Sequence, residues 1–141
     1  MIEIVNRQRK VPVFPERWHL FTSRALKATP AEAADVTIAF VSDRQMRELN
    51  RQWRGQTGTT DVLSFPAGDD EFANPNGSNL GDVVISLEQA ARQAREHDLT
   101  LDEEVAQLIL HGLLHLCGYD HETDGGEMNR VELKLRKKLR I

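Results

Sequence analysis

Three histidines within eleven residues constrain this chain more than any other feature: His111, His115 and His121. His111 and His115 are four positions apart, so on a helix their imidazoles lie on one face, a turn apart. Gly118 follows, and glycine readily ends a helix in the left-handed conformation. A chain that turns there can bring His121 back towards the other two. The spacing predicts a zinc site with these three histidines as ligands and a fourth position open to water, as is typical of catalytic zinc.

The residue after the first histidine indicates which class of zinc hydrolase the sequence resembles. In the metzincin pattern HExxHxxGxxH, a glutamate at that position is the general base of a protease. Gly112 stands there in this chain. The sequence keeps the ligand spacing and lacks the base, which favours a zinc hydrolase other than a peptidase. The alternative is a set of buried or capping histidines, but this spacing around a glycine favours a metal site.

The composition is typical of a globular protein from a reducing compartment. With 141 residues, 40% of them hydrophobic and 28% charged, we expect one domain spanning residues 1–141. No apolar run approaches the roughly 20 residues of a membrane span, and the N-terminus lacks the layout of a signal peptide. A single cysteine excludes an internal disulfide. We therefore predict a cytoplasmic location.

The net charge of −4 bears on possible partners. It argues against a protein that coats nucleic acid through a uniformly basic surface. It is compatible with a local basic cleft on an acidic body, because the electrostatic field depends on how charges are distributed.

Periodicity and capping residues predict an α+β fold, with a small mixed β-sheet of about four strands packed with about five helices. The expected strands are residues 2–5, 36–41, 61–66 and 81–86. The expected helices begin at Pro15, after Ser42, after Ser86, after Thr100, and after Thr123 or Asp124, the last ending near Leu139. Ser42 with Gln45, and Thr100 with Glu103, are predicted to form capping boxes. Trp18 and Phe21 are expected on the inward face of the first helix, and Met46 and Trp53 on one shared face of the second. The polar segment 67–80 is expected to be a mobile loop.

Cys117 lies inside the histidine cluster, and thiolates bind zinc well. On a helix with about 100° per residue, however, it points roughly 240° away from His111 and 200° away from His115. We therefore expect a buried core cysteine rather than a ligand.

Four stretches together resemble the YbeY family of bacterial endoribonucleases, and they stand in the family's order. The histidine segment resembles the signature HGxLHLxGYDH, and residues 60–66 resemble the block TDVLSFP. Leu49-Asn50 with Trp53-Arg54 resembles the preceding block, and residues 80–86 resemble the family's LGD strand. The resemblance covers residues 49–121.

The resemblance implies a zincin-like metal-hydrolase fold with one Zn²⁺ per chain. It also implies a single-strand-specific endoribonuclease that acts in rRNA processing, including maturation of the 16S rRNA 3′ end, and in ribosome quality control. The partners implied are single-stranded RNA, ribosomal RNA and the small ribosomal subunit; neither a membrane nor DNA is expected. Two alternatives stay open: a zinc metallopeptidase-like hydrolase, and a non-catalytic ribosome-associated zinc protein.

Arg54 matches the family's functional arginine, and we expect it to be catalytic. A guanidinium fits phosphate in bidentate fashion and stays charged, so it suits the stabilisation of a phosphoryl group during cleavage. The alternative is an exposed arginine that suits the C-terminal dipole of its helix. Asp120 adjoins His121, and we expect its carboxylate to orient a metal ligand. Asp61 and Asp82 stand in the matching motifs, where a structural role in a turn or cap stays open, and Tyr119 could hydrogen-bond in the pocket or pack.

Overall fold

Four β-strands form one mixed sheet in the computed structural model, which describes residues 1–67, 79–120 and 122–141. The strands are β1 (Ile2–Asn6), β2 (Asp35–Val41), β3 (Val62–Pro66) and β4 (Asn79–Ser86). They lie in the order β1-β2-β4-β3. The pairs β1–β2 and β2–β4 are parallel, whereas β3 pairs antiparallel with β4 at the edge of the sheet. The α+β mixed-sheet prediction is confirmed.

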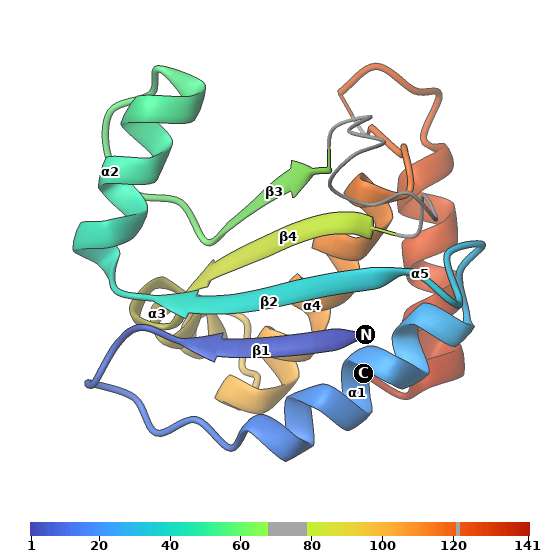
Figure 1. Cartoon of the computed structure of the whole chain (residues 1–141), viewed down its shortest axis with the longest axis horizontal. Helices are drawn as coiled ribbons and strands as arrows, with labels where there is room; N and C mark the ends of the chain where they lie inside the picture. The colour runs from blue at the N-terminus through green and yellow to red at the C-terminus, as the bar shows by residue number, and fades with distance from the viewer. Residues whose placement is uncertain (68–78, 121) are drawn as a thin grey trace.

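The described part of the chain also contains five helices. They are α1 (Pro15–Lys27), α2 (Asp43–Arg54), α3 (Leu87–Glu96), α4 (Leu101–Leu116) and α5 (Glu127–Leu139). Figure 1 shows α3, α4 and α5 behind the sheet, with α2 rising from the end of β2. None of these helices combines the length and apolar character needed to cross a bilayer.

The two faces of the sheet carry different cores because neighbouring residues of a strand point to opposite faces. Ile38 and Val83 face the larger core, which they share with α1, α3, α4 and α5. Val41 and Val84 face Met46 of α2 in a smaller cluster on the other side. Helices α4 and α2 therefore lie on opposite faces, and β3 forms the edge between them.

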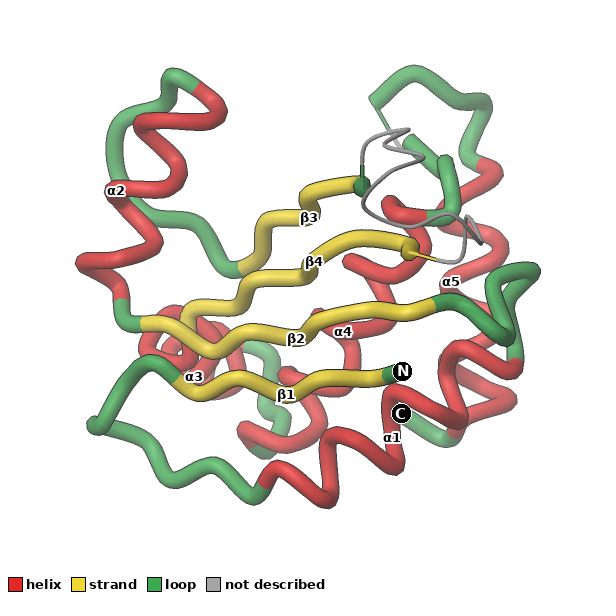
Figure 2. Tube along the Cα trace, viewed as in Figure 1, coloured by secondary structure: helices red, strands yellow, loops and turns green. Residues whose placement is uncertain are grey.

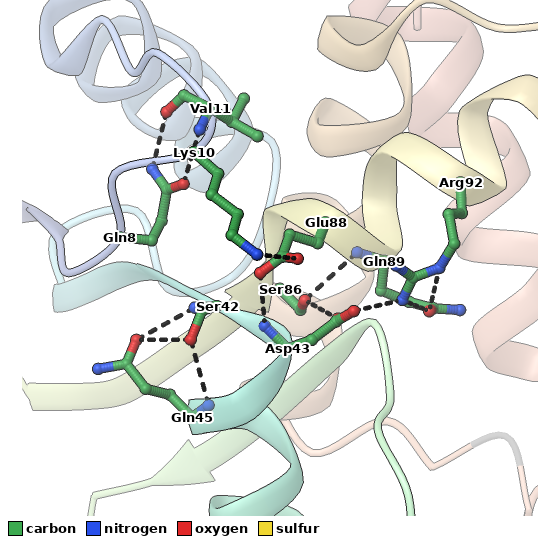
Figure 3. A network of polar contacts seen from close by, with 10 residues as sticks. All are labelled: Gln8, Lys10, Val11, Ser42, Asp43, Gln45, Ser86, Glu88, Gln89 and Arg92. Carbon is green, nitrogen blue, oxygen red and sulfur yellow. Dashed lines mark hydrogen bonds and ion pairs between the residues drawn. The ribbon is translucent and has the colours of Figure 1, made fainter.

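The start of α2 is held by a network of polar contacts, shown in Figure 3. Ser42 and Gln45 form the predicted capping box. Ser86 Oγ donates to Asp43 Oδ1 at 2.7 Å, and Arg92 donates to Oδ2 at 2.6 Å. Burial raises the pKa of the Asp43 carboxyl, but the Ser86 and Arg92 hydrogen bonds and the Arg92 charge lower it, to a net value below normal. These contacts tie α2 to the junction of β4 and α3.

Two predicted boundaries were wrong. Asn79 and Leu80, assigned to a loop, belong to β4, and the remainder of that predicted loop, residues 68–78, lies outside the described residues. The last helix begins at Glu127, later than a cap at Thr123 or Asp124 predicts. Asp124 still satisfies its first turn, because Oδ2 accepts a hydrogen bond from the Met128 backbone N–H at 2.9 Å.

Candidate active site

Helix α4 presents the first two predicted zinc ligands on one face. It starts with the expected Thr100–Glu103 capping box and is buried along most of its length. His111 and His115 are only half-buried, so this face reaches the molecular surface. Their ring centroids lie 4.8 Å apart, and the ring planes are inclined by 76°. The i, i+4 spacing thus brings the two imidazoles together, as predicted.

The chain reverses direction directly after α4. Gly118 has a positive φ of 98°, and its N–H donates to the His115 carbonyl at 3.0 Å. The Tyr119 N–H reaches back to the Leu114 carbonyl at 3.1 Å, which completes a glycine-dependent helix end. The predicted turn at Gly118 is confirmed.

The third predicted ligand, His121, lies outside the described residues. Within residues 1–67, 79–120 and 122–141, no group of three or more His, Cys, Asp or Glu side chains is arranged to hold a metal ion. The residues on either side of His121, Asp120 and Glu122, border the same cleft as His111 and His115.

Gly112 allows α4 to lie against the edge of the sheet. A Cβ at this position would come within 2.6 Å of Val83 Cγ1 and 3.2 Å of Ser64 Oγ. Ser64 Oγ also donates a hydrogen bond to the Gly112 carbonyl at 3.1 Å. The absence of a glutamate here therefore has a packing reason, because a side chain at this position would require Val83 or α4 to move.

A cleft of about 740 Å³ runs along β3 and receives groups from both faces of the sheet. The two histidines border it from α4, and Arg54 borders it from the last position of α2. Figure 2 shows β3 between α2 and the loop that precedes α5. The structure thus places Arg54 and the two histidines, which are 57 or more positions apart in sequence, around one cleft.

The loop between α2 and β3 forms the polar wall of this cleft. The buried Asn50 donates from Nδ2 to the Gly58 carbonyl at 3.2 Å, which links α2 to the loop. Gln56, Thr57, Thr59 and Thr60 all border the cleft. The arginine at the end of α2 therefore adjoins a row of uncharged hydrogen-bonding groups.

The other motif residues divide between the cleft and the sheet. Asp61, Tyr119 and Asp120 border the cleft. Asp61 Oδ1 accepts a hydrogen bond from the Val62 N–H at 2.8 Å, which supports a structural role. Asp120 is exposed and accepts one from the Glu122 N–H at 3.0 Å. Asp82 is exposed on β4 and does not border the cleft.

Glu132 contacts the site and was missed in the sequence. Both of its carboxylate oxygens lie 3.2 Å from His111 Nδ1, and its side chain is only 8% exposed. Burial raises the pKa of the Glu132 carboxyl, but the His111 hydrogen bond and the charges of His111 and Arg136 lower it, to a net value below normal. One feature of the sequence could have indicated Glu132: it is an acidic residue between Met128 and Leu135, on the stretch of the last helix whose apolar residues face inward.

Cys117 is not among the described residues that border the cleft. It is half-buried, so the prediction of a fully buried core cysteine was too strong. Burial raises the pKa of its thiol, an effect partly offset by a hydrogen bond with Thr29. A protonated thiol is a poor zinc ligand.

Comparisons with known proteins identify the family. A family model described as Endoribonuclease YbeY matches residues 3–140. A protein of that name from Alkaliphilus metalliredigens is 40% identical over 137 residues, which cover 92% of this chain and 88% of the relative. Another from Myxococcus xanthus is 53% identical over 103 residues, which cover 72% of this chain and 35% of that protein. A third from Anaeromyxobacter is 48% identical, and the match covers 54% of its length. This chain thus spans between about a third and nine-tenths of these relatives.

A solved structure agrees with the sequence comparisons. The solution structure of TM1509 from Thermotoga maritima aligns with a TM-score of 0.66 at 29% identity, covering 99% of this chain and 89% of the other. The alignment thus spans nearly the whole chain, including the sheet and the described helices. The chain belongs to the YbeY family of endoribonucleases.

Proposed function

We propose that this chain is a zinc-dependent endoribonuclease that cleaves single-stranded RNA, with His111, His115 and His121 as metal ligands and Arg54 as the catalytic cation. The observation that carries the proposal is the convergence of His111, His115 and Arg54 on one cleft from opposite faces of the sheet. Following the family resemblance, we propose that it acts in the cytoplasm on ribosomal RNA and the small ribosomal subunit. Its roles there would be 16S rRNA 3′ end maturation and ribosome quality control.

The charges around the cleft support a bound cation. Among the described residues that border it, Asp61, Asp120 and Glu122 are acidic and Arg54 is the basic residue. A phosphodiester is anionic and would be repelled by this set of side chains. A divalent ion between the histidines would offset the excess negative charge of these side chains, and clustered imidazoles are donors that zinc prefers.

When bound, the metal would lower the pKa of a coordinated water and polarise a phosphoryl oxygen. The protein's own groups would then position the substrate. Arg54 would bind the scissile phosphate with two parallel N–H donors and stabilise the negative charge that develops on it. The hydroxyls and amides of residues 56–60 would hydrogen-bond the neighbouring sugar and phosphate oxygens.

Gly112 disfavours a peptidase, because its tight contact with Val83 leaves no room for the glutamate that acts as the base in zinc proteases. A non-catalytic zinc protein would instead need a fourth protein ligand and would unfold on chelation without turnover.

The first experiment is cleavage of a labelled single-stranded RNA by protein of known metal content. His115→Ala should lose zinc and cleavage together. His19→Ala is the matched control, because this exposed histidine on α1 does not border the cleft. Contaminating ribonucleases would survive equally in all three preparations. Equal cleavage by the parent and His115→Ala, or zinc-loaded protein without any cleavage of RNA, would refute the catalytic proposal.

A further inference from the structure

We infer that Glu132 is a positioning residue that fixes the orientation and tautomer of His111 for metal binding. The inference deepens the proposed function and depends on its assignment of His111 as a ligand. It places one part of the metal site on α5, a helix outside all the sequence blocks that resemble the family's motifs.

The geometry singles out one nitrogen of His111. Its Nδ1 lies 3.2 Å from Oε1 and 3.2 Å from Oε2 of Glu132, so the carboxylate straddles the position of an Nδ1 hydrogen. A carboxylate is an acceptor only, and a neutral imidazole carries one hydrogen. Glu132 therefore favours the tautomer with the hydrogen on Nδ1, which leaves the lone pair on Nε2.

The two cavities beside His111 indicate the direction of each ring nitrogen. His111 borders both the main cleft and a second cavity of about 500 Å³, whereas Glu132 borders only the second. The ring thus forms part of the wall between the two cavities, with Nδ1 directed at Glu132. The other ring nitrogen is then the one suited to bind an ion on the side of the main cleft.

Glu132 is itself held in place. Arg136, one turn later on α5, donates from Nη2 to Oε1 at 3.2 Å. The Glu132 side chain is 8% exposed, and a carboxylate so buried is retained only with partners that compensate for lost hydration. If Glu132 served only to pair with Arg136 on the same helix, its carboxylate would not need to face His111. Both of its oxygens approach Nδ1 of His111, and this favours a positioning role over simple packing of α5.

Glu104 offers a matched comparison within the same chain. It is also a buried glutamate, and its Oε2 lies 3.0 Å from Nδ1 of another histidine, His97. His97 borders the second cavity but not the main cleft. The two pairs share their chemistry and differ in whether the histidine faces the proposed metal position.

The test is the affinity for Zn²⁺ alone, measured by competition with a chromophoric chelator. Glu132→Gln is close to isosteric, but its amide offers an acceptor and a donor, so it no longer selects one tautomer. We expect a 10- to 100-fold loss of zinc affinity, the range found when carboxylates that orient ligating histidines are changed. Glu104→Gln should bind zinc like the parent. Equal affinity of Glu132→Gln and the parent would overturn the inference.

A second measurement needs no variant. Long-range ¹H–¹⁵N NMR spectra of the metal-free parent, at a pH where the ring is neutral, report which nitrogen of His111 carries the hydrogen. We expect Nδ1, and a hydrogen on Nε2 would contradict the inference even if Glu132→Gln failed to fold. Neither readout uses RNA. Zinc binding that depends on Glu132 in a protein that does not cleave RNA would refute the proposed function and leave the positioning role intact.

Discussion

Gly112 and Val83 lie so close together that a Cβ on residue 112 would come within 2.6 Å of Val83 Cγ1. This contact fixes how deeply α4 sits against β4, and therefore where His111 and His115 meet the cleft. We expect Gly112→Ala to lower the free energy of unfolding by about 1–3 kcal/mol, as overpacked cores do. Denaturant unfolding at neutral pH measures the loss.

The control for this contact is Gly125→Ala. Gly125 has no positive φ, and a Cβ there would have open space. Its substitution should change the free energy of unfolding by less than about 0.5 kcal/mol, as is usual for surface sites. If Gly112→Ala and Gly125→Ala had equal free energies of unfolding, α4 and β4 would accommodate the added methyl group without loss of stability, and the prediction would be wrong.

Arg54→Ala should separate catalysis from metal binding. The side chain is exposed at the end of α2 and does not belong to the predicted ligand set, so zinc content and unfolding should match the parent. Cleavage of single-stranded RNA should fall about 10²- to 10³-fold, the usual effect of removing one group that stabilises transition-state charge. Single-turnover kinetics together with an RNA-binding titration would assign the loss to chemistry or to affinity.

Arg51→Ala is the control for Arg54. Arg51 lies one turn earlier on α2, pairs with Glu48 and does not border the cleft. It should cleave like the parent. If Arg54→Ala also cleaves like the parent, the assignment of Arg54 as the catalytic cation is wrong.

Local patterns in the sequence predicted most of the fold, because the signals that set it are local. The capping boxes at Ser42 and Thr100 were predicted in place. The inward face of α1 was also predicted, and Trp18 and Phe21 are buried. Trp53 was expected on the same helix face as Met46, yet it is 67% exposed, and its ring lies 6.0 Å from that of Phe65 on the edge strand β3. Periodicity gives the face of a helix but not how much of that face the edge of a sheet covers.

The site was predictable only where its residues share one helix. The pairing of His111 with His115 follows from the period of α4, and their meeting with Arg54 was expected from the family resemblance rather than from spacing. Glu132 approaches His111 from 21 positions away, through the packing of α5 on α4. The apolar stripe of α5 could mark Glu132 as buried, but its pairing with His111 depends on tertiary structure, which no local pattern encodes.

Cys117→Ser should leave zinc affinity unchanged. The cysteine adjoins the ligand segment in sequence but lies outside the cleft, where burial raises its thiol pKa. Its reaction with a soluble alkylating reagent at neutral pH should be slower than that of a free thiol, because the thiolate is the reacting form. A tenfold or larger loss of zinc affinity in Cys117→Ser would show that the thiol takes part in the metal site.

Asp43→Asn should weaken the anchor of α2 in a pH-dependent way. The variant loses the charge that accepts hydrogen bonds from Ser86 and Arg92, and we expect a loss of roughly 1–3 kcal/mol at pH 7. The folded-state pKa of Asp43 is below its unfolded value of about 3.9. Its contribution is therefore complete above that unfolded value and disappears as the pH falls through the folded pKa.

The pH dependence of the stability loss in Asp43→Asn shows whether the loss comes from the missing charge or from altered packing. The stability difference between the parent and Asp43→Asn should be constant from pH 7 to about pH 5 and shrink below about pH 4. Asp102→Asn is the control, because Asp102 pairs with Arg17 on the surface, where ion pairs contribute little. Urea unfolding at several pH values gives both differences. A difference for Asp43→Asn that persists undiminished at pH 3 would mean that the ionised carboxylate is not what holds the start of α2.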